Sequence, residues 1–227
     1  MKTLNQYIKE KLIINQRFDE KLIINKDYVD AHTLTPESFD ELVNIISYRY
    51  KKLGPGTKKN PIDFNDIDVS NLDSFCGEYD KGLFENTDFK YIDISYWDVS
   101  NIKLMRGMFF MCKELKSVGD ISNWDVSKVT NMGDMFFRCE KLESVGDISK
   151  WNVSKVTNMS YMFCGYKKFN QNISGWDVSS VKDMEAMFKY CENFNQDLSN
   201  WNISKVKFKE YIFDNCPIKN EYEPKFK

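Results

Sequence analysis

The side chains with the most obvious capacity for chemistry in this chain of 227 residues are its six cysteines. Four of them, Cys112, Cys139, Cys191 and Cys216, each follow a tryptophan by fifteen residues. Zinc sites use close pairs such as C-x-x-C with histidine common among the ligands, and the sequence contains no such pair. We therefore expect these thiols to fill small apolar spaces in the interior, as buried cysteines often do. Disulfides between neighbouring repeats are the alternative.

The only histidine, His32, lies in the polar stretch DAHTLTP. A single histidine cannot build a metal cluster of histidines, and nothing marks a serine or cysteine as its nucleophilic partner. The stretch GPGTKKN at 54–60 contains glycines and lysines but lacks the G-x-x-x-x-G-K-[ST] spacing of a phosphate-binding loop. We predict no catalytic residue, no metal ligand and no cofactor, and hence a protein that is not an enzyme.

Aspartate or asparagine recurs at two positions, one before each tryptophan and one directly after it. Ladders of carboxylates can bind calcium. However, asparagine replaces aspartate freely here, and the glycine-rich nonapeptides of calcium-binding β-rolls are missing. Side-chain bonds to turn amides suit both residue types, so we expect turn capping. The ten residues are Asp93, Asp120, Asp147, Asn172 and Asp197 before the tryptophans, and Asp98, Asp125, Asn152, Asp177 and Asn202 after them.

These residues belong to a repeat in which tryptophans are separated by 27, 27, 25 and 25 residues. The repeat reads W-[DN]-[VI]-S-x-[VI]-x-x-M-x-x-M-F-x-x-C, and a degraded sixth copy precedes it, with IDVS at 67–70 and LF at 83–84. A fixed period of this length is typical of stacked repeat architectures. We predict two structural ladders, formed by Trp97, Trp124, Trp151, Trp176 and Trp201 and by Phe109, Phe136, Phe163, Phe188 and Phe213.

Each copy is predicted to form a strand followed by a helix. In the second copy Ser127 suits a helix N-cap. The apolar residues that follow it are spaced to share one helical face: Val129, Met132, Met135, Phe136 and Cys139. The predicted fold class is α/β, a right-handed solenoid similar to leucine-rich repeats, with five to six strand-helix coils, a parallel sheet and a helical N-terminal cap.

Stacking would let each coil bury apolar side chains that it cannot bury alone. Replacing Phe136 by alanine is accordingly expected to cost roughly 3–5 kcal/mol. For the tryptophans, burial in the stack is the expected arrangement. The alternative is an exposed aromatic face that receives sugars or the apolar side chains of a partner.

The stretch TPESFDELVNIISYRYKKLG predicts a helix that covers the first coil, with Thr35 as N-cap, Pro36 in the first turn and Gly54 at the end. Its apolar stripe consists of Phe39, Leu42, Val43, Ile46, Tyr50 and Leu53. Lys209 replaces the first methionine in the last copy, as expected of a terminal repeat. Three parts are predicted: a helical N-terminal segment and cap at 1–60, the repeats at 61–216 and a polar tail at 217–227.

The repeat, followed by F-N-Q-D-L-S-N-W, resembles the BspA-like repeats of bacterial surface proteins. These are relatives of leucine-rich repeats that include a lipoprotein-associated domain of unknown function. The resemblance covers about two thirds of the chain, from Ile67 to Cys216, and implies a leucine-rich-repeat-like solenoid with a role in binding or adhesion.

The opening MKTLNQYIKEKLIIN is similar to amino-terminal segments of gut bacteriophage proteins, and KLIIN recurs at 21–25. Leu4, Ile8 and Leu12 are spaced for an amphipathic helix. We expect this helix to dock on or cap the repeats. A segment that binds a partner or targets the protein is the alternative.

The balance of 32 basic and 34 acidic residues, net charge −2, gives no bulk attraction to nucleic acid or anionic lipid. No apolar run is long enough for a membrane span or a secretion signal, which favours the cytoplasm or a virion over secretion. The predicted function is a non-enzymatic scaffold that binds a protein partner through one face. The alternative is a surface or virion-associated adhesin that binds glycans or a host-cell surface.

Overall fold

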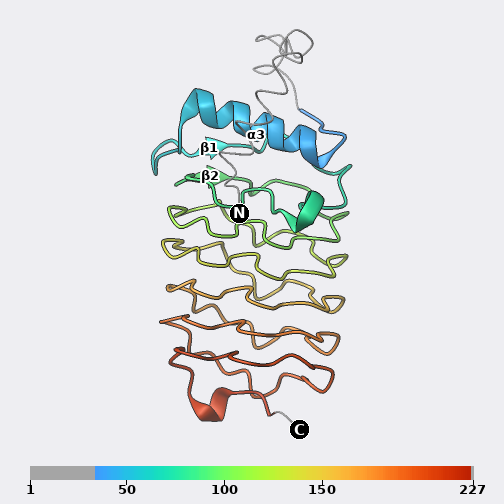
Figure 1. The fold of residues 1–227 in the computed structure, drawn as a ribbon, viewed down its shortest axis with the longest axis vertical. Helices are drawn as coiled ribbons and strands as arrows, with labels where there is room; N and C mark the ends of the chain where they lie inside the picture. The colour runs from blue at the N-terminus through green and yellow to red at the C-terminus, as the bar shows by residue number, and fades with distance from the viewer. Residues whose placement is uncertain (1–33, 226–227) are drawn as a thin grey trace.

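The computed structural model describes residues 34–225. His32, the two KLIIN segments and the helix expected around Leu4, Ile8 and Leu12 lie outside this part of the chain. Figure 1 shows the described part as layers of turns stacked along one axis, with a single long helix across the N-terminal end of the stack.

That helix is α3, Phe39–Leu53. It begins after Ser38, whose hydroxyl accepts a hydrogen bond from the amide of Glu41 at 3.2 Å, and it ends at Gly54, which has φ 75°. The predicted N-cap, Thr35, is therefore wrong. Ser38 takes this role because its hydroxyl satisfies a first-turn amide that would otherwise lack a partner, while the Glu41 carboxylate accepts from the amide of Glu37, just before the cap.

One face of α3 packs into the same hydrophobic core as the repeats, through Leu42, Val43, Ile45 and Ile46. Leu53, which we assigned to this stripe, is 56% exposed. The last turn, residues 51–53, is exposed throughout, so it extends past the apolar surface that the helix covers.

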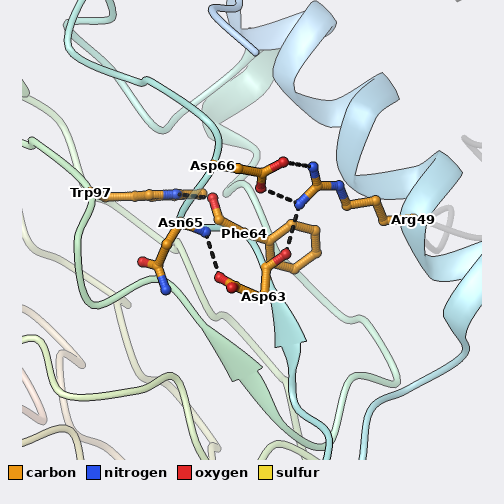
Figure 2. A network of polar contacts seen from close by, with 6 residues as sticks. All are labelled: Arg49, Asp63, Phe64, Asn65, Asp66 and Trp97. Atoms are coloured by element: carbon orange, nitrogen blue, oxygen red, sulfur yellow. Dashed lines mark hydrogen bonds and ion pairs between the residues drawn. The ribbon is translucent and has the colours of Figure 1, made fainter. Parts of the chain in front are cut away.

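A buried arginine joins α3 to the first repeat (Figure 2). Arg49 donates to the backbone carbonyl of Asp63 at 2.7 Å and forms an ion pair with the carboxylate of Asp66. Its guanidinium lies 5.6 Å from the centre of the Phe64 ring, and the carbonyl of Phe64 accepts the indole N–H of Trp97. The sequence pattern did not identify this polar anchor between helix and repeats.

The regular strands in the described residues are β1, Ile62–Asp63, and β2, Ile92–Asp93, which pair in parallel with Ile62 opposite Ile92. Two short 3-10 turns complete the elements, η2 at Glu78–Asp80 and η3 at Asn220–Tyr222. Elsewhere the repeats meet through isolated parallel bridges at equivalent positions, which join Leu104 to Asn131, Asn131 to Asn158, Asn158 to Asp183 and Asp183 to Phe208. Equivalent residues of successive repeats therefore lie over one another.

The predicted α/β solenoid of five to six strand-helix coils with a parallel sheet is wrong. The described residues contain one α-helix and a sheet of two strands, each two residues long. The segments expected to be helices are successions of turns, and Ser127 caps no helix. The amide of Ser127 instead donates to the side chain of Asp125 at 3.0 Å.

Backbone hydrogen bonding explains why the helices do not form. An α-helix bonds each N–H to the carbonyl four residues earlier. Here Met132 and Asp134 donate to Asn158 and Ser160 of the next repeat at 3.0 and 2.8 Å. The amide of Met135, which lies between two residues that bond to the next repeat, donates to the carbonyl of Met132 only three residues earlier. In addition, Asp134 has φ 60°, which a right-handed helix does not accommodate.

The spacing of the apolar residues nevertheless identified the buried positions correctly, because the tight turns point the same side chains inward that a helix would. Val129, Met132, Met135, Phe136 and Cys139 are all fully buried. No helix in the part of the chain from 34 to 225 is long and apolar enough to cross a membrane.

Candidate functional site

The five tryptophans are buried inside the stack. Trp124 stacks on Trp151 with 6.5 Å between ring centres, and Trp151 stacks on Trp176 at 6.4 Å. Each indole N–H donates to a backbone carbonyl of the preceding repeat, as Trp151 does to Ile121 at 3.2 Å and Trp176 to Ile148 at 2.9 Å. With exposures of 3–6%, the indoles offer no open ring face to a sugar or a partner.

The phenylalanines form a second internal column, which begins in the degraded first copy. Phe84 stacks on Phe109 at 5.3 Å with an interplanar angle of 4°, and Phe109 on Phe136 at 5.4 Å. The column continues through Phe163 and Phe188 to Phe213 at spacings of 6.0, 5.8 and 5.7 Å. Phe213, in the last copy, is only partly buried.

All six cysteines are free thiols, and Cys112, Cys139, Cys164 and Cys191 are buried. Cys112 and Cys139 each donate to the carbonyl of the column phenylalanine in the preceding repeat, Phe84 and Phe109. Burial raises the pKa of Cys112 to about 11, so the thiol stays protonated at neutral pH. These cysteines fill the interior, as expected from the sequence.

The repeated aspartates and asparagines cap turns, as predicted. All ten accept a hydrogen bond from the amide two residues later. Asp125 and Asn152, at equivalent positions, accept from Ser127 and Ser154 at 3.0 and 3.2 Å. Either residue serves because both provide the same Oδ1 acceptor, which explains why asparagine substitutes for aspartate.

The residues that differ between repeats are interspersed with the constant methionine, phenylalanine and cysteine positions. We call this side of the stack the variable face. It consists of residues 106–107, 110–111, 133–134, 137–138, 160–161, 164–165, 185–186, 189–190, 210–211 and 214–215, of which Gly107, Gly133, Ser160, Cys164, Gly165 and Ala186 are buried.

Direct backbone bonds hold the variable face together. The amides of Met111 and Arg138 donate to Phe137 and Cys164 of the next repeat at 2.8 and 2.7 Å. Repeats therefore present their variable residues in fixed vertical register.

Aromatic and cationic side chains gather on this face. Phe110 and Phe137 stack at 4.8 Å, and Tyr161 meets Phe137 edge-on at 6.1 Å. The guanidinium of Arg138 lies 5.6 Å from the Phe137 ring centre, and Arg106 forms an ion pair of 3.3 Å with Asp134. The three rings are half-buried, so they are held in place while part of each remains accessible.

Toward the C-terminal end the same face becomes more polar. The hydroxyl of Tyr161 donates to the carboxylate of Glu185, and this bond raises the pKa of Tyr161 to about 12. Lys189 forms an ion pair of 2.8 Å with Asp214 and lies 4.7 Å from the ring centre of Tyr211. Outside the variable face, in the degraded first copy, burial raises the pKa of the Glu85 carboxyl and lowers the pKa of the Lys81 ammonium.

From the sequence we predicted that a partner binds through one face of the repeats, without naming Phe110, Phe137 or Tyr161. Aligning the copies could have found them, because these aromatic residues occupy positions at which the repeat pattern specifies no residue type. Because these positions looked like the wet side of a helix, their packing against one another was not foreseen.

A family model described as "Mycoplasma protein of unknown function, DUF285" matches the chain twice, over residues 78–164 and 137–223. Together the two matches cover more than half of the chain. The chain belongs to the DUF285 family. Comparison with curated proteins and with solved structures found no match. The DUF285 matches span the tryptophan and phenylalanine columns and the whole variable face, whereas α3 lies outside them.

Proposed function

We propose that this chain is a non-enzymatic scaffold that binds a protein partner through the variable face. The observation that carries the proposal is the cluster of Phe110, Phe137, Tyr161 and Arg138, which is partly exposed and held rigidly by neighbouring repeats. Aromatic residues and arginine dominate the binding energy of protein interfaces.

The rigidity of the cluster favours binding because little conformational entropy is lost when a partner docks. Phe110 and Phe137 already stack, and Arg138 already lies against the Phe137 ring. Meanwhile the constant residues of each repeat are committed to the interior, which leaves the variable positions free to differ without changing the stack.

The chemistry of the thiols also supports a non-enzymatic role. Burial raises the pKa of Cys164 and Cys216 to about 11, so neither supplies an appreciable fraction of nucleophilic thiolate at neutral pH. The alternative of an exposed tryptophan face that receives sugars gains no support, since all five indoles are buried.

The test is affinity capture from the native cell with quantitative mass spectrometry. The bait proteins are the unmodified chain, the double variant Phe137→Ala/Arg138→Ala and the control Tyr96→Ala. Tyr96 is an aromatic residue that is 84% exposed and lies outside the variable face. We expect a partner recovered with the unmodified chain and with Tyr96→Ala, and at least about tenfold less of it with the double variant.

Near-ultraviolet circular dichroism of each bait establishes that the stack is intact. A partner that is captured equally by all three folded baits would contradict the assignment of the variable face. Binding to a glycan array that is lost in the double variant would instead replace the protein partner by a sugar.

A further inference from the structure

The degraded first copy contains a loop that the full copies lack. Leu83 follows Ile67 by sixteen residues, whereas the equivalent two residues in each full copy are eleven apart. The five additional residues are 77–81, and an antiparallel bridge between Cys76 and Gly82 closes them into a loop. We call residues 77–81 the insertion loop. Figure 1 shows it as the short green helical ribbon beneath α3.

The insertion loop is held at both ends. The amide of Gly77 donates to the carbonyl of Lys81 at 2.9 Å, and a Cβ added to Gly77 would lie 2.4 Å from the ring of Phe39 in α3. At the other end, a Cβ added to Gly82 would lie 1.8 Å from the carbonyl oxygen of Gly107 in the next repeat. These close approaches fix the position of the loop relative to both α3 and the repeats.

The insertion loop lies at the N-terminal end of the variable face. Gly107 belongs to that face, and the Cys76 thiol donates to the carbonyl of its neighbour Arg106 at 2.9 Å. Shortly after the loop, the Asn86 amide donates to the carbonyl of Phe110 at 2.7 Å. A partner that covers the exposed part of the Phe110 ring therefore also reaches the insertion loop.

Tyr79 projects from the middle of the insertion loop. Its side chain is 98% exposed, more than any other large apolar or aromatic side chain in residues 34–225. Its φ of 60° lies in the left-handed region, which costs energy for a residue other than glycine. A ring that is exposed in this way contributes little to the fold, whereas tyrosine is enriched among the residues that dominate the binding energy of protein interfaces.

Exposed carboxylates gather around the insertion loop. Four lie on the loop or in the segment 34–41 that leads into α3, whose Phe39 the loop contacts: Glu37, Asp40, Glu41 and Glu78. Lys81 is the only basic residue in the sequence of these two segments, and Arg106 beneath the loop is already paired with Asp134 at 3.3 Å. The corner that carries Tyr79 is therefore negatively charged and attracts a positively charged surface.

We infer that Tyr79 inserts into a pocket on a basic surface of the protein partner that covers the variable face. This inference rests on the proposed function, which it deepens by adding a second contact and by assigning a charge to the partner. Phe110 and Phe137 provide a broad contact area, and Tyr79 is an anchor at its edge. Lysine or arginine side chains around the partner's pocket pair with the carboxylates of Asp40 and Glu78.

The first experiment places a photo-crosslinking amino acid in the full chain, as Tyr79→p-benzoylphenylalanine or, as the matched control, Tyr96→p-benzoylphenylalanine. Each protein is incubated with extract of the native cell and irradiated, and the adducts are identified by mass spectrometry. We expect position 79 to crosslink to the partner whose capture depends on Phe137 and Arg138. The adduct from position 96, which is exposed but outside the variable face, should be at least about tenfold weaker.

Affinity capture with further variants measures the two parts of the contact. Tyr79→Ala should retain at least about tenfold less of the same partner, and Tyr96→Ala as much as the unmodified chain. Asp40→Asn/Glu78→Gln should retain about fivefold less and make retention less sensitive to salt. Glu143→Gln/Glu192→Gln, a matched pair of exposed carboxylates outside both regions, should change neither. Near-ultraviolet circular dichroism checks that each variant keeps the stack intact.

The inference is wrong if positions 79 and 96 crosslink equally, if Tyr79→Ala retains the partner in full, or if the two charge variants behave alike. An adduct between two copies of this chain would show self-association instead. A partner that is lost with Phe137→Ala/Arg138→Ala but retained by Tyr79→Ala overturns this inference and leaves the proposed function standing. A partner retained by both variants, or no partner at all, contradicts both.

Discussion

At the scale of the residue, the tryptophan and phenylalanine that recur in each copy make a bond or a stack with the neighbouring repeat. The indole N–H of Trp97 reaches the carbonyl of Phe64 in the first repeat at 2.8 Å. That first repeat has Ile67 at the tryptophan position, where no preceding repeat offers a carbonyl. Isoleucine is buried there without leaving a polar group unpaired, which accounts for the departure from the pattern.

Replacing Trp151 by phenylalanine tests the bond between repeats. The substitution removes the indole donor to Ile121, whose carbonyl keeps a bond from the backbone amide of Trp124. We expect the free energy of unfolding to fall by about 0.5–1.5 kcal/mol, the usual net contribution of one hydrogen bond, measured by urea denaturation. Tyr96→Phe, at an exposed position, is the matched control and should change stability little. Equal effects of the two substitutions would argue against the bond.

Phe136→Ala tests the phenylalanine column. The ring is fully buried and stacks on Phe109 and Phe163, so its loss leaves a cavity in the middle of the stack. The expected cost remains roughly 3–5 kcal/mol in the same denaturation assay. The helix from which this prediction was first made does not form, but the ring is buried as the prediction requires. An unchanged melting temperature would contradict the column.

At the scale of the element, left-handed residues define the repeat. They occur four residues apart in successive copies, at Asp134 and Arg138 and again at Tyr161 and Gly165. Glycine is the residue that tolerates this conformation best, and Asp134, Arg138 and Tyr161 adopt it at an energetic cost. The turns persist because each makes bonds to the neighbouring repeat.

Gly165→Ala tests the turn geometry. Gly165 has φ 74°, and an added Cβ would lie 3.3 Å from the side chain of Arg138. Strain and this close contact should lower the free energy of unfolding by about 1–2 kcal/mol. Gly175→Ala is the control, because a Cβ there meets nothing within 4 Å and its φ lies outside the left-handed region. Loss of stability at Gly175 but not at Gly165 would contradict the turn assignment.

The capped turns make stability depend on pH. Hydrogen bonds from Ser127 and Ser179 lower the pKa of Asp125 and Asp177 in the folded state. A carboxyl with a lowered folded pKa stabilises above its unfolded pKa, about 3.9, and this contribution is lost as the pH falls through the folded value.

The variant Asp125→Asn/Asp177→Asn isolates this effect. Asparagine keeps the Oδ1 acceptor, as Asn152 and Asn202 show at equivalent turns. We expect stability near that of the unmodified chain at pH 7 and a smaller decline below pH 4, measured by urea denaturation across pH. Asp125→Ala/Asp177→Ala should be less stable already at pH 7. A pH dependence that is the same in the asparagine variant would refute the assignment.

At the scale of the whole molecule, stability should be a sum over repeats and their interfaces. Deleting residues 124–150, one full period, joins Asn123 to Trp151. Trp151 then takes the place of Trp124, whose indole N–H donates to the carbonyl of Ile94. We expect this variant to fold cooperatively with lower stability, as judged by near-ultraviolet circular dichroism and urea denaturation. Deleting 124–136 removes half a period, breaks the columns and should abolish folding. Folding of both variants would mean that register between repeats is unimportant.

Taken by itself, the sequence determined which residues are buried and which recur in contact. The period fixed the columns of Trp124 and Phe136, and the exchange of aspartate for asparagine identified the capped turns. The α3 helix was also predictable, because a helix of 15 residues carries its own caps and apolar stripe. All of these follow from local chemistry or from equivalence between copies.

Only the tertiary structure decided the path of the backbone between those residues. The spacing of Met132, Met135 and Phe136 suits a helix and a series of tight turns alike, since both bring every third or fourth residue inward. The choice depends on where the amides find acceptors. The amides of Met132 and Asp134 find them in the next repeat rather than in their own, and that bond exists only once the repeats have stacked.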